Sequence, residues 1–340
     1  MWNHGARRPD GGRRAPCAWL SAALAVTLVT CGPQAPAQQP PAVDLAAPRD
    51  AQVAPAGRPT DGPSATARPL GSEPAADSAA SAGGEPPSLL EAALQLVPRD
   101  PGRPSTEDAR AVLDELVADW HASLPADASP EQRAATLSAV LFDRGGFRST
   151  NDLADGDALF LDTVLTERRG YCLSLSVVAL ALADAVGEPV HALALPNHAL
   201  VRWDDGRQHL NLELTRGGAL VSDADLAAHL GPFGRTDGIY LRRLERHELL
   251  ALMIHNRGFV HLEAGRVEAA RADLESAVRS LPDLAEAHRN LGVLHGEAGR
   301  FDLAIACFGR ALAAHPGDAD ALLNLAVARA GADDLAGALE

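Results

Sequence analysis

The pattern of apolar and polar residues divides residues 89–250 into a helical first part and a strand-rich second part. Ser105–His121 and Pro130–Asp143 carry apolar residues at helical spacing, and each range opens with residues typical of a helix start. A shorter helix is expected near Asp157–Thr166. The apolar run Val177–Val186 predicts a further helix, which closes the helical part.

Gly187 ends the last of these helices as a C-cap, and beyond it the pattern changes to alternation. Three strands are expected, over Pro189–Leu195, His198–Asp204 and Arg207–Thr215. The dipeptide Asp205-Gly206 is typical of a type I′ turn and joins the last two strands as a hairpin. If these two residues form the loop, His198 lies directly opposite Glu213, at a Cβ separation of about 4.5–5.5 Å.

The C-terminal part of the chain repeats itself with a period of about 34 residues. Two copies and an incomplete third cover Ala251–Leu284, Ala285–Asp318 and Ala319–Glu340. Gly258 and Gly292 recur where paired helices cross closely, and Pro282 and Pro316 close the first two copies. This is the tetratricopeptide pattern, and it predicts an all-α solenoid. The concave surface of such a solenoid either binds a protein partner or only caps the neighbouring domain.

The N-terminus has the layout of a secretory signal. Arginines within residues 1–16 precede the apolar run Ala18–Thr30, which is shorter than the roughly 20 residues that span a bilayer. The run ends at Cys31 in a sequence that resembles the lipobox of bacterial lipoproteins. Residues 1–31 therefore predict export and a membrane tether through lipidation of Cys31. Cleavage near Ala37 would instead give a soluble exported protein.

Composition adds a spacer between this signal and the folded part. Residues 32–88 are mostly Ala, Pro, Gly, Ser and Asp, with few aromatic or long aliphatic side chains. Such a segment buries too little apolar surface to offset the entropy lost on ordering. It is predicted to be a disordered linker, which suits a tethered domain that reaches away from a membrane.

Charge and cysteine spacing exclude several functions. The formal net charge is −15, and the chain contains arginine but no lysine. A chain without a basic block does not suit nucleic acid, because phosphate contacts need clustered positive charge. Cys17, Cys31, Cys172 and Cys307 lie far apart without CxxC spacing, which argues against a zinc site and a disulfide scaffold. No metal or cofactor is expected, and Cys307 is interpreted as a small buried hydrophobe.

The candidate chemistry centres on Cys172, which is expected at or near a helix N-terminus. There the helix dipole stabilises a thiolate, and free backbone N–H groups can receive an oxyanion. His198 can serve as the base, and Glu213 on the neighbouring strand can orient its imidazole. Asn211 shares the face of Glu213 and is an alternative orienting residue. Tyr171 can donate a hydrogen bond near the oxyanion.

Three sequence blocks carry a family resemblance. They are Gly170–Ser176, Pro196–His198 and Asn211–Thr215, and they contain Cys172, His198 and Glu213. They resemble the transglutaminase-like superfamily, in particular a bacterial cysteine-protease-like branch that often ends in tetratricopeptide repeats. The resemblance spans about residues 110–230 and implies an α+β fold. A papain/transglutaminase-like domain of helices and an antiparallel sheet would occupy residues 89–248, followed by the solenoid at 251–340. The superfamily's usual third residue is Asp, so Glu213 is one methylene longer.

The resemblance also implies an activity. Cys172 would attack an amide carbonyl, His198 would transfer protons, and Glu213 would hold the imidazole, which makes a cysteine-dependent amide or peptide hydrolase or an acyltransferase. Hydrolysis of a peptide or protein substrate is favoured, because acyl transfer needs a site that excludes water and nothing in the sequence indicates such a site. Export would place this activity in the cell envelope or periplasm. The alternative is a non-catalytic envelope scaffold that binds partners through its repeats.

Overall fold

The structure is a computed structural model that describes residues 87–98, 101–152, 155–230 and 238–332. The predicted signal segment with Cys31 and almost all of the predicted linker lie outside the described residues, as does the end of the third repeat copy. Within the described ranges, no helix is both long enough and apolar enough to cross a membrane.

Among the described residues, five α-helices precede the sheet. They are α1 (Leu89–Leu94), α2 (Thr106–Ser123), α3 (Pro130–Ser138), α4 (Leu161–Glu167) and α5 (Cys172–Val186). Side-chain caps begin two of them as predicted: Ser105 accepts the backbone N–H of Asp108 at 3.0 Å, and Ser129 and Gln132 cap each other's N–H groups. The predicted helix Pro130–Asp143 ends earlier, because Ala139–Arg144 forms a π-helical turn.

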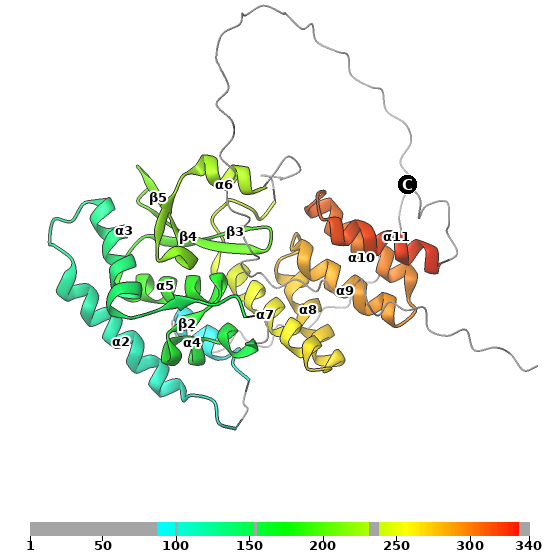
Figure 1. The fold of residues 1–340 in the computed structure, drawn as a ribbon, viewed down its shortest axis with the longest axis horizontal. Coiled ribbons are helices and arrows are strands. Elements are labelled where there is room, and N and C mark those ends of the chain that lie inside the picture. Colours follow the sequence, from blue (N-terminus) through cyan, green and yellow to red (C-terminus); the bar gives the residue numbers. More distant parts are fainter. Residues whose placement is uncertain (1–86, 99–100, 153–154, 231–237, 333–340) are drawn as a thin grey trace, which may run out of the picture. The chain divides into compact units, whose positions relative to one another are not determined.

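Helix α5 is the centre of the domain. Every residue from Cys172 to Ala183 is buried, since the helix contacts α2 and α4 on one side and strands β3 and β4 on the other (Figure 1). An apolar helix without a polar face is stable only when it is surrounded in this way. Gly187 ends it in the left-handed conformation with φ 74°, which a glycine adopts at little cost.

An antiparallel sheet covers α5. Its strands, in spatial order, are β3 (Val190–Leu195), β4 (His198–Asp204), β5 (His209–Glu213) and β6 (Ala219–Val221). The third predicted strand ends at Glu213, where a 3₁₀ turn over Leu214–Arg216 redirects the chain into β6. The sequence pattern did not reveal β6, nor the helix α6 (Asp223–Leu230) that follows it. A separate parallel pair joins β1 (Arg148–Ser149) to β2 (Arg169–Gly170) immediately before α5.

The pairing of β4 with β5 differs from the predicted hairpin. Val201 pairs with Leu212, not with Leu210 as the predicted register required. The shift is two residues, so each side chain keeps its face of the sheet. His198 and Glu213 are therefore diagonal neighbours, and the prediction that they lie directly opposite each other is wrong.

The turn explains the shift. A type I′ loop of Asp205 and Gly206 needs positive φ at both residues. Gly206 has φ 81°, whereas Asp205 is not among the non-glycine residues of the described ranges with positive φ. The Asp205 carboxylate instead accepts the backbone N–H groups of Arg207 and Gln208 at 2.8 and 3.0 Å. Asp205 is thus the residue that precedes the two central residues of the turn, and Gly206 takes the first central position.

The C-terminal part consists of paired antiparallel helices (Figure 1). They are α7 (Arg246–Glu263), α8 (Val267–Ser280), α9 (Ala285–Glu297), α10 (Phe301–Ala314) and α11 (Ala319–Gly331). A Cβ on Gly292 would lie 2.5 Å from the Phe308 ring, so α9 and α10 approach each other only because this residue is glycine. Cys307 is partly buried on α10 and packs against the main core.

Helix α7, the first helix of the repeats, contacts both the next repeat helix and the first domain. It begins at Arg246, before the predicted repeat start at Ala251, and packs against α8 as well as α1 and α5. Arg246 donates to the carbonyl oxygen of Pro87 at 2.7 Å, and Arg257 donates to that of Leu96 at 3.2 Å. The first helix of the repeats therefore holds both ends of α1 in place.

Candidate functional site

Cys172 is the first residue of α5 and is fully buried. The backbone before it is held by Ser174, whose hydroxyl accepts the N–H of Tyr171 at 2.8 Å and donates to the carbonyl of Ala158 at 2.8 Å. A Cβ on Gly170 would lie 2.6 Å from the Ser174 hydroxyl oxygen, so a side chain there would displace this contact. The helix start that presents the thiol thus depends on the sequence Gly-Tyr-Cys-x-Ser.

His198 and Glu213 form a buried pair. The Nε2 of His198 lies 2.6 Å from Oε2 of Glu213, and each residue is 4% exposed. The second carboxylate oxygen of Glu213 accepts the N–H and the hydroxyl of Thr215 at 3.1 and 2.6 Å. The structure therefore brings the predicted base and acid together although the predicted register was wrong. A diagonal neighbour lies farther away than an opposed residue but within reach of a long side chain such as Glu.

The environment of Glu213 favours its charged form. Burial alone would raise the pKa of this carboxyl, but the hydrogen bonds from His198 and Thr215 outweigh burial and hold the pKa below its ordinary value. Glu213 is consequently ionised at neutral pH. An ionised carboxylate on Nε2 fixes the ring orientation and leaves Nδ1 as the other nitrogen for proton exchange.

The lowered pKa of Glu213 predicts a loss of stability in acid. A carboxyl with a lower pKa in the folded chain adds stability above its unfolded pKa, near 4.5, and loses this contribution as pH falls through the folded pKa. Urea unfolding at pH 7, 5 and 3.5 should therefore show a smaller acid-induced loss for Glu213→Gln than for the unmodified protein. Parallel losses in the two proteins would show that this carboxyl does not contribute.

The structure places Asn211 away from the imidazole. Its Oδ1 accepts from Arg202 at 2.6 Å, and its Nδ2 donates to Asp223 at 2.9 Å and to the carbonyl of Val221 at 3.1 Å. These contacts tie β4 and β5 to the start of α6. Asn211 thus links β5 to β4 and β6 and is not positioned to orient His198.

Tyr171 is also committed elsewhere. Its hydroxyl donates to the carbonyl oxygens of Asp152 and Asp155, the latter at 3.1 Å. Its ring packs in a small apolar cluster with Phe160 and Phe259, which belongs to α7. Burial, followed by the charges of Asp155 and Asp152, raises the pKa of Tyr171, so the hydroxyl remains a donor. The expected role of Tyr171 at an oxyanion is not supported by this arrangement.

A second histidine adjoins the pair. The ring of His229, on α6, lies 5.8 Å from the ring of His198 between centroids, at an interplanar angle of 41°. Desolvation, and next the neighbouring His198, lower the pKa of His229 below its ordinary value. No spacing in the sequence could indicate this residue, because α6 carries no pattern that relates it to β4.

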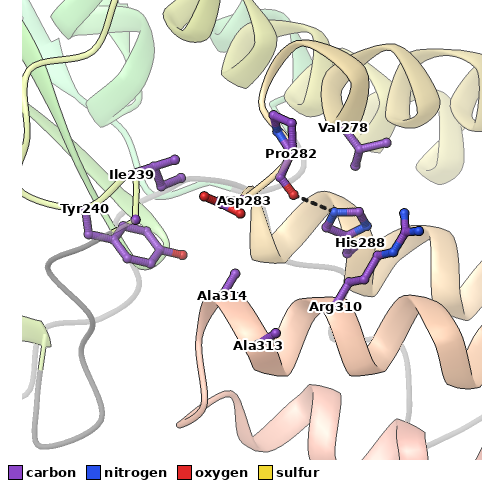
Figure 2. Close-up of a pocket in the computed structure, with 10 residues that line it drawn as sticks. Ile239, Tyr240, Val278, Pro282, Asp283, His288, Arg310, Ala313 and Ala314 are labelled. Carbon is purple, nitrogen blue, oxygen red and sulfur yellow. Dashed lines mark hydrogen bonds between the residues drawn. The ribbon is translucent and has the colours of Figure 1, made fainter. Parts of the chain in front are cut away.

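A cavity of about 380 Å³ lies beside the repeats. It is lined by residues of α8, α9 and α10 and by the segment 238–240, and Figure 2 shows Tyr240 facing the repeat helices across it. Cys172, His198 and Glu213 do not line this cavity. Among the described residues, no group of three or more His, Cys, Asp or Glu side chains is arranged to hold a metal ion.

Comparison with known proteins agrees with this architecture. A family model described as transglutaminase-like superfamily matches residues 107–255, and a tetratricopeptide repeat model matches residues 249–317. A UPF0162 protein of Pseudomonas aeruginosa is 29% identical over 205 residues, which cover 60% of this chain and 76% of that protein. Mouse F-box only protein 21 is 30% identical over 79 residues, or 23% of this chain and 13% of that protein.

Among solved structures, a crystal structure of menin has a TM-score of 0.42 at 15% identity, and the match covers 74% of this chain and 64% of menin. The two family models, the antiparallel sheet and the helical C-terminal part confirm the predicted α+β fold class. The chain contains a transglutaminase-like domain followed by tetratricopeptide repeats.

Proposed function

We propose that the protein is a cysteine-dependent amide or peptide hydrolase. Cys172 is the nucleophile, His198 the general base and acid, and Glu213 the residue that orients the imidazole. The observation that carries this proposal is the buried 2.6 Å contact between His198 and Glu213, with His198 on a strand that packs against the helix that begins with Cys172. Burial of an ionised carboxylate costs free energy, and a carboxylate kept on the ring of a buried histidine supports a functional role for the pair.

The proposed reaction follows from which ring nitrogen Glu213 holds. Because Glu213 faces Nε2, Nδ1 takes the thiol proton, and the thiolate attacks the amide carbonyl. Backbone N–H groups at the start of α5 stabilise the oxyanion. The imidazolium then gives its proton to the leaving amine, which breaks the C–N bond and leaves a thioester on Cys172. A water molecule deprotonated by His198 attacks the thioester, releasing the carboxylic acid and the free thiol.

The burial of Cys172 bears on substrate entry. The residue is 0% exposed, so a substrate reaches the sulfur only after neighbouring side chains move. The same burial favours a second candidate function, a non-catalytic scaffold in which Cys172 is a core residue. Acyl transfer to an amine would also benefit from the exclusion of water at a buried thiol.

Partners and location complete the proposal. The tetratricopeptide repeats support a protein-binding role, and the substrate is proposed to be a peptide or protein recruited by them. Export to the cell envelope or periplasm and a lipid tether at Cys31 are supported by the signal-like residues 1–31.

A peptide-library digest tests the activity. Incubation of the full chain with the library, followed by mass spectrometry, should show cleavage that Cys172→Ala lowers by about 10³-fold or more. Cys307→Ala, which removes the other cysteine of the described region, should cleave like the unmodified protein. Cleavage that persists in Cys172→Ala would overturn the hydrolase proposal. No cleavage at all, with partner capture unaffected by Cys172→Ala, would establish the scaffold instead.

A further inference from the structure

The turn that leads into His198 is unfavourable by itself. Leu195 and His198 pair across β3 and β4, so Pro196 and Asn197 form a two-residue loop. Asn197 has φ 55°, in the left-handed region, which asparagine adopts more readily than most residues but less readily than glycine. Proline followed by a positive-φ asparagine is the residue pattern of a type II turn, whose twist does not match that of a hairpin. Such a turn needs support from outside the two strands.

The support comes from the second repeat. The Oε1 of Glu286 accepts the backbone N–H of Asn197 at 3.0 Å, across a separation of 89 residues in the chain. Glu286 is the second residue of α9 and is 2% exposed. The positive end of the helix dipole stabilises its charge there, and a hydrogen bond to a carboxylate is stronger than one to a neutral acceptor.

A neighbouring segment encloses this contact. Tyr240 forms an isolated β-bridge with Ala194 of β3, and the N–H of Leu241 donates to the carbonyl of Ala194 at 3.0 Å. Tyr240 is 2% exposed, and burial, followed by the charges of Glu286 and Asp318, raises its pKa well above the ordinary value. Figure 2 shows its ring directed toward the repeat helices. The acceptor of the Glu286–Asn197 contact is thus buried, which makes the contact costly to break.

We infer that Glu286 is a positioning residue for His198. By holding the N–H of Asn197, its carboxylate maintains the left-handed turn from which β4 begins, and so places the imidazole of the next residue against Glu213. The second repeat thus contributes a contact that positions a residue of the candidate site. Its importance for catalysis rests on the proposed function, whereas its effect on the position of His198 does not.

Hydrogen exchange tests the contact directly. In Glu286→Ala, the amide of Asn197 should exchange about tenfold faster or more, because its acceptor is lost. Glu286→Gln, which keeps an amide oxygen, should remain close to the unmodified protein. Asp273→Ala is the matched control. It removes another buried carboxylate of the repeats, whose described partners are Arg257 and His261 and not residues of this turn. It should leave the Asn197 amide unchanged.

Two readouts at the site complete the experiment. The ring resonances of His198 should shift in Glu286→Ala and return in Glu286→Gln, and alkylation of Cys172 by iodoacetamide at pH 7 should fall about tenfold in the alanine variant alone. Adding Asn197→Gly should restore much of both, since glycine adopts the turn without support. Unchanged His198 resonances in Glu286→Ala would overturn the inference. Shifted resonances with unchanged alkylation would uphold it and count instead against the proposed hydrolase.

Discussion

Replacing His198 by alanine should lower the rate at which iodoacetamide alkylates Cys172 at pH 7 by about 100-fold, the lower end of what a positioned general base contributes. The imidazole that Glu213 orients is proposed to take the thiol proton, and only the thiolate reacts. Peptide-resolved mass spectrometry separates Cys172 from the other cysteines.

The same sample contains an internal reference. Burial raises the pKa of the Cys307 thiol, so its alkylation should be slow and identical in both proteins. Because Cys172 is buried, the absolute rate of its alkylation is limited by opening of the site. The informative quantity is therefore the ratio of the alkylation rates in the variants and the unmodified protein. In Glu213→Gln, the alkylation rate of Cys172 should lie between the rates in the unmodified protein and in His198→Ala, since an uncharged amide still contacts the ring. Equal or faster alkylation of Cys172 in His198→Ala would show that this histidine does not activate the thiol.

Replacing Arg289 by methionine should destabilise the protein by about 3–5 kcal/mol. Arg289 on α9 forms an ion pair with Asp318, and both side chains are 3% exposed. Methionine fills similar volume but leaves a buried carboxylate without its cation, and an uncompensated buried charge is the costly outcome. The loss should appear as a lower urea midpoint with an unchanged slope.

Two further variants identify the cause of that loss. Arg310→Met, on an exposed position of α10, should change the free energy of unfolding by less than about 0.5 kcal/mol. Arg289→Met combined with Asp318→Asn should recover part of the loss, because asparagine is neutral and still accepts the N–H of Ala321 that Asp318 now accepts at 2.9 Å. If the double variant were as unstable as Arg289→Met, packing and not charge would be responsible.

Most of the elements near the site could be predicted from local patterns. The apolar run after Cys172, the left-handed Gly187 and the alternating residues of β3 and β4 all follow from short-range rules. The strand β6 has three residues, too few for a periodic signal. The predicted hairpin register was wrong because Asp205-Gly206 can take two places in a turn. Both residues can be central, or Gly206 can be the first central residue, and the side-chain contacts of Asp205 favour the second.

The site itself was predictable only in part. An even register error preserves faces, so His198 and Glu213 still met. Asn211 shares their face, but Arg202 and Asp223 compete for its side chain, and the alternation pattern contains no information on that competition. His229 and Glu286 come from other elements, so their positions follow from tertiary packing and leave no signal in local spacing.

The long-range contacts of α7 and α9 have a consequence for biosynthesis. Arg257 meets the carbonyl of Leu96 across 161 residues, and Glu286 meets Asn197 across 89. The N-terminal part of a chain leaves the ribosome first. Helix α1 and the strand that bears His198 therefore emerge well before Arg257 and Glu286, which contact the segments beside them. Contacts of such high sequence separation form slowly. The end of α1 and the turn before His198 therefore stay without these contacts until the repeats have been translated.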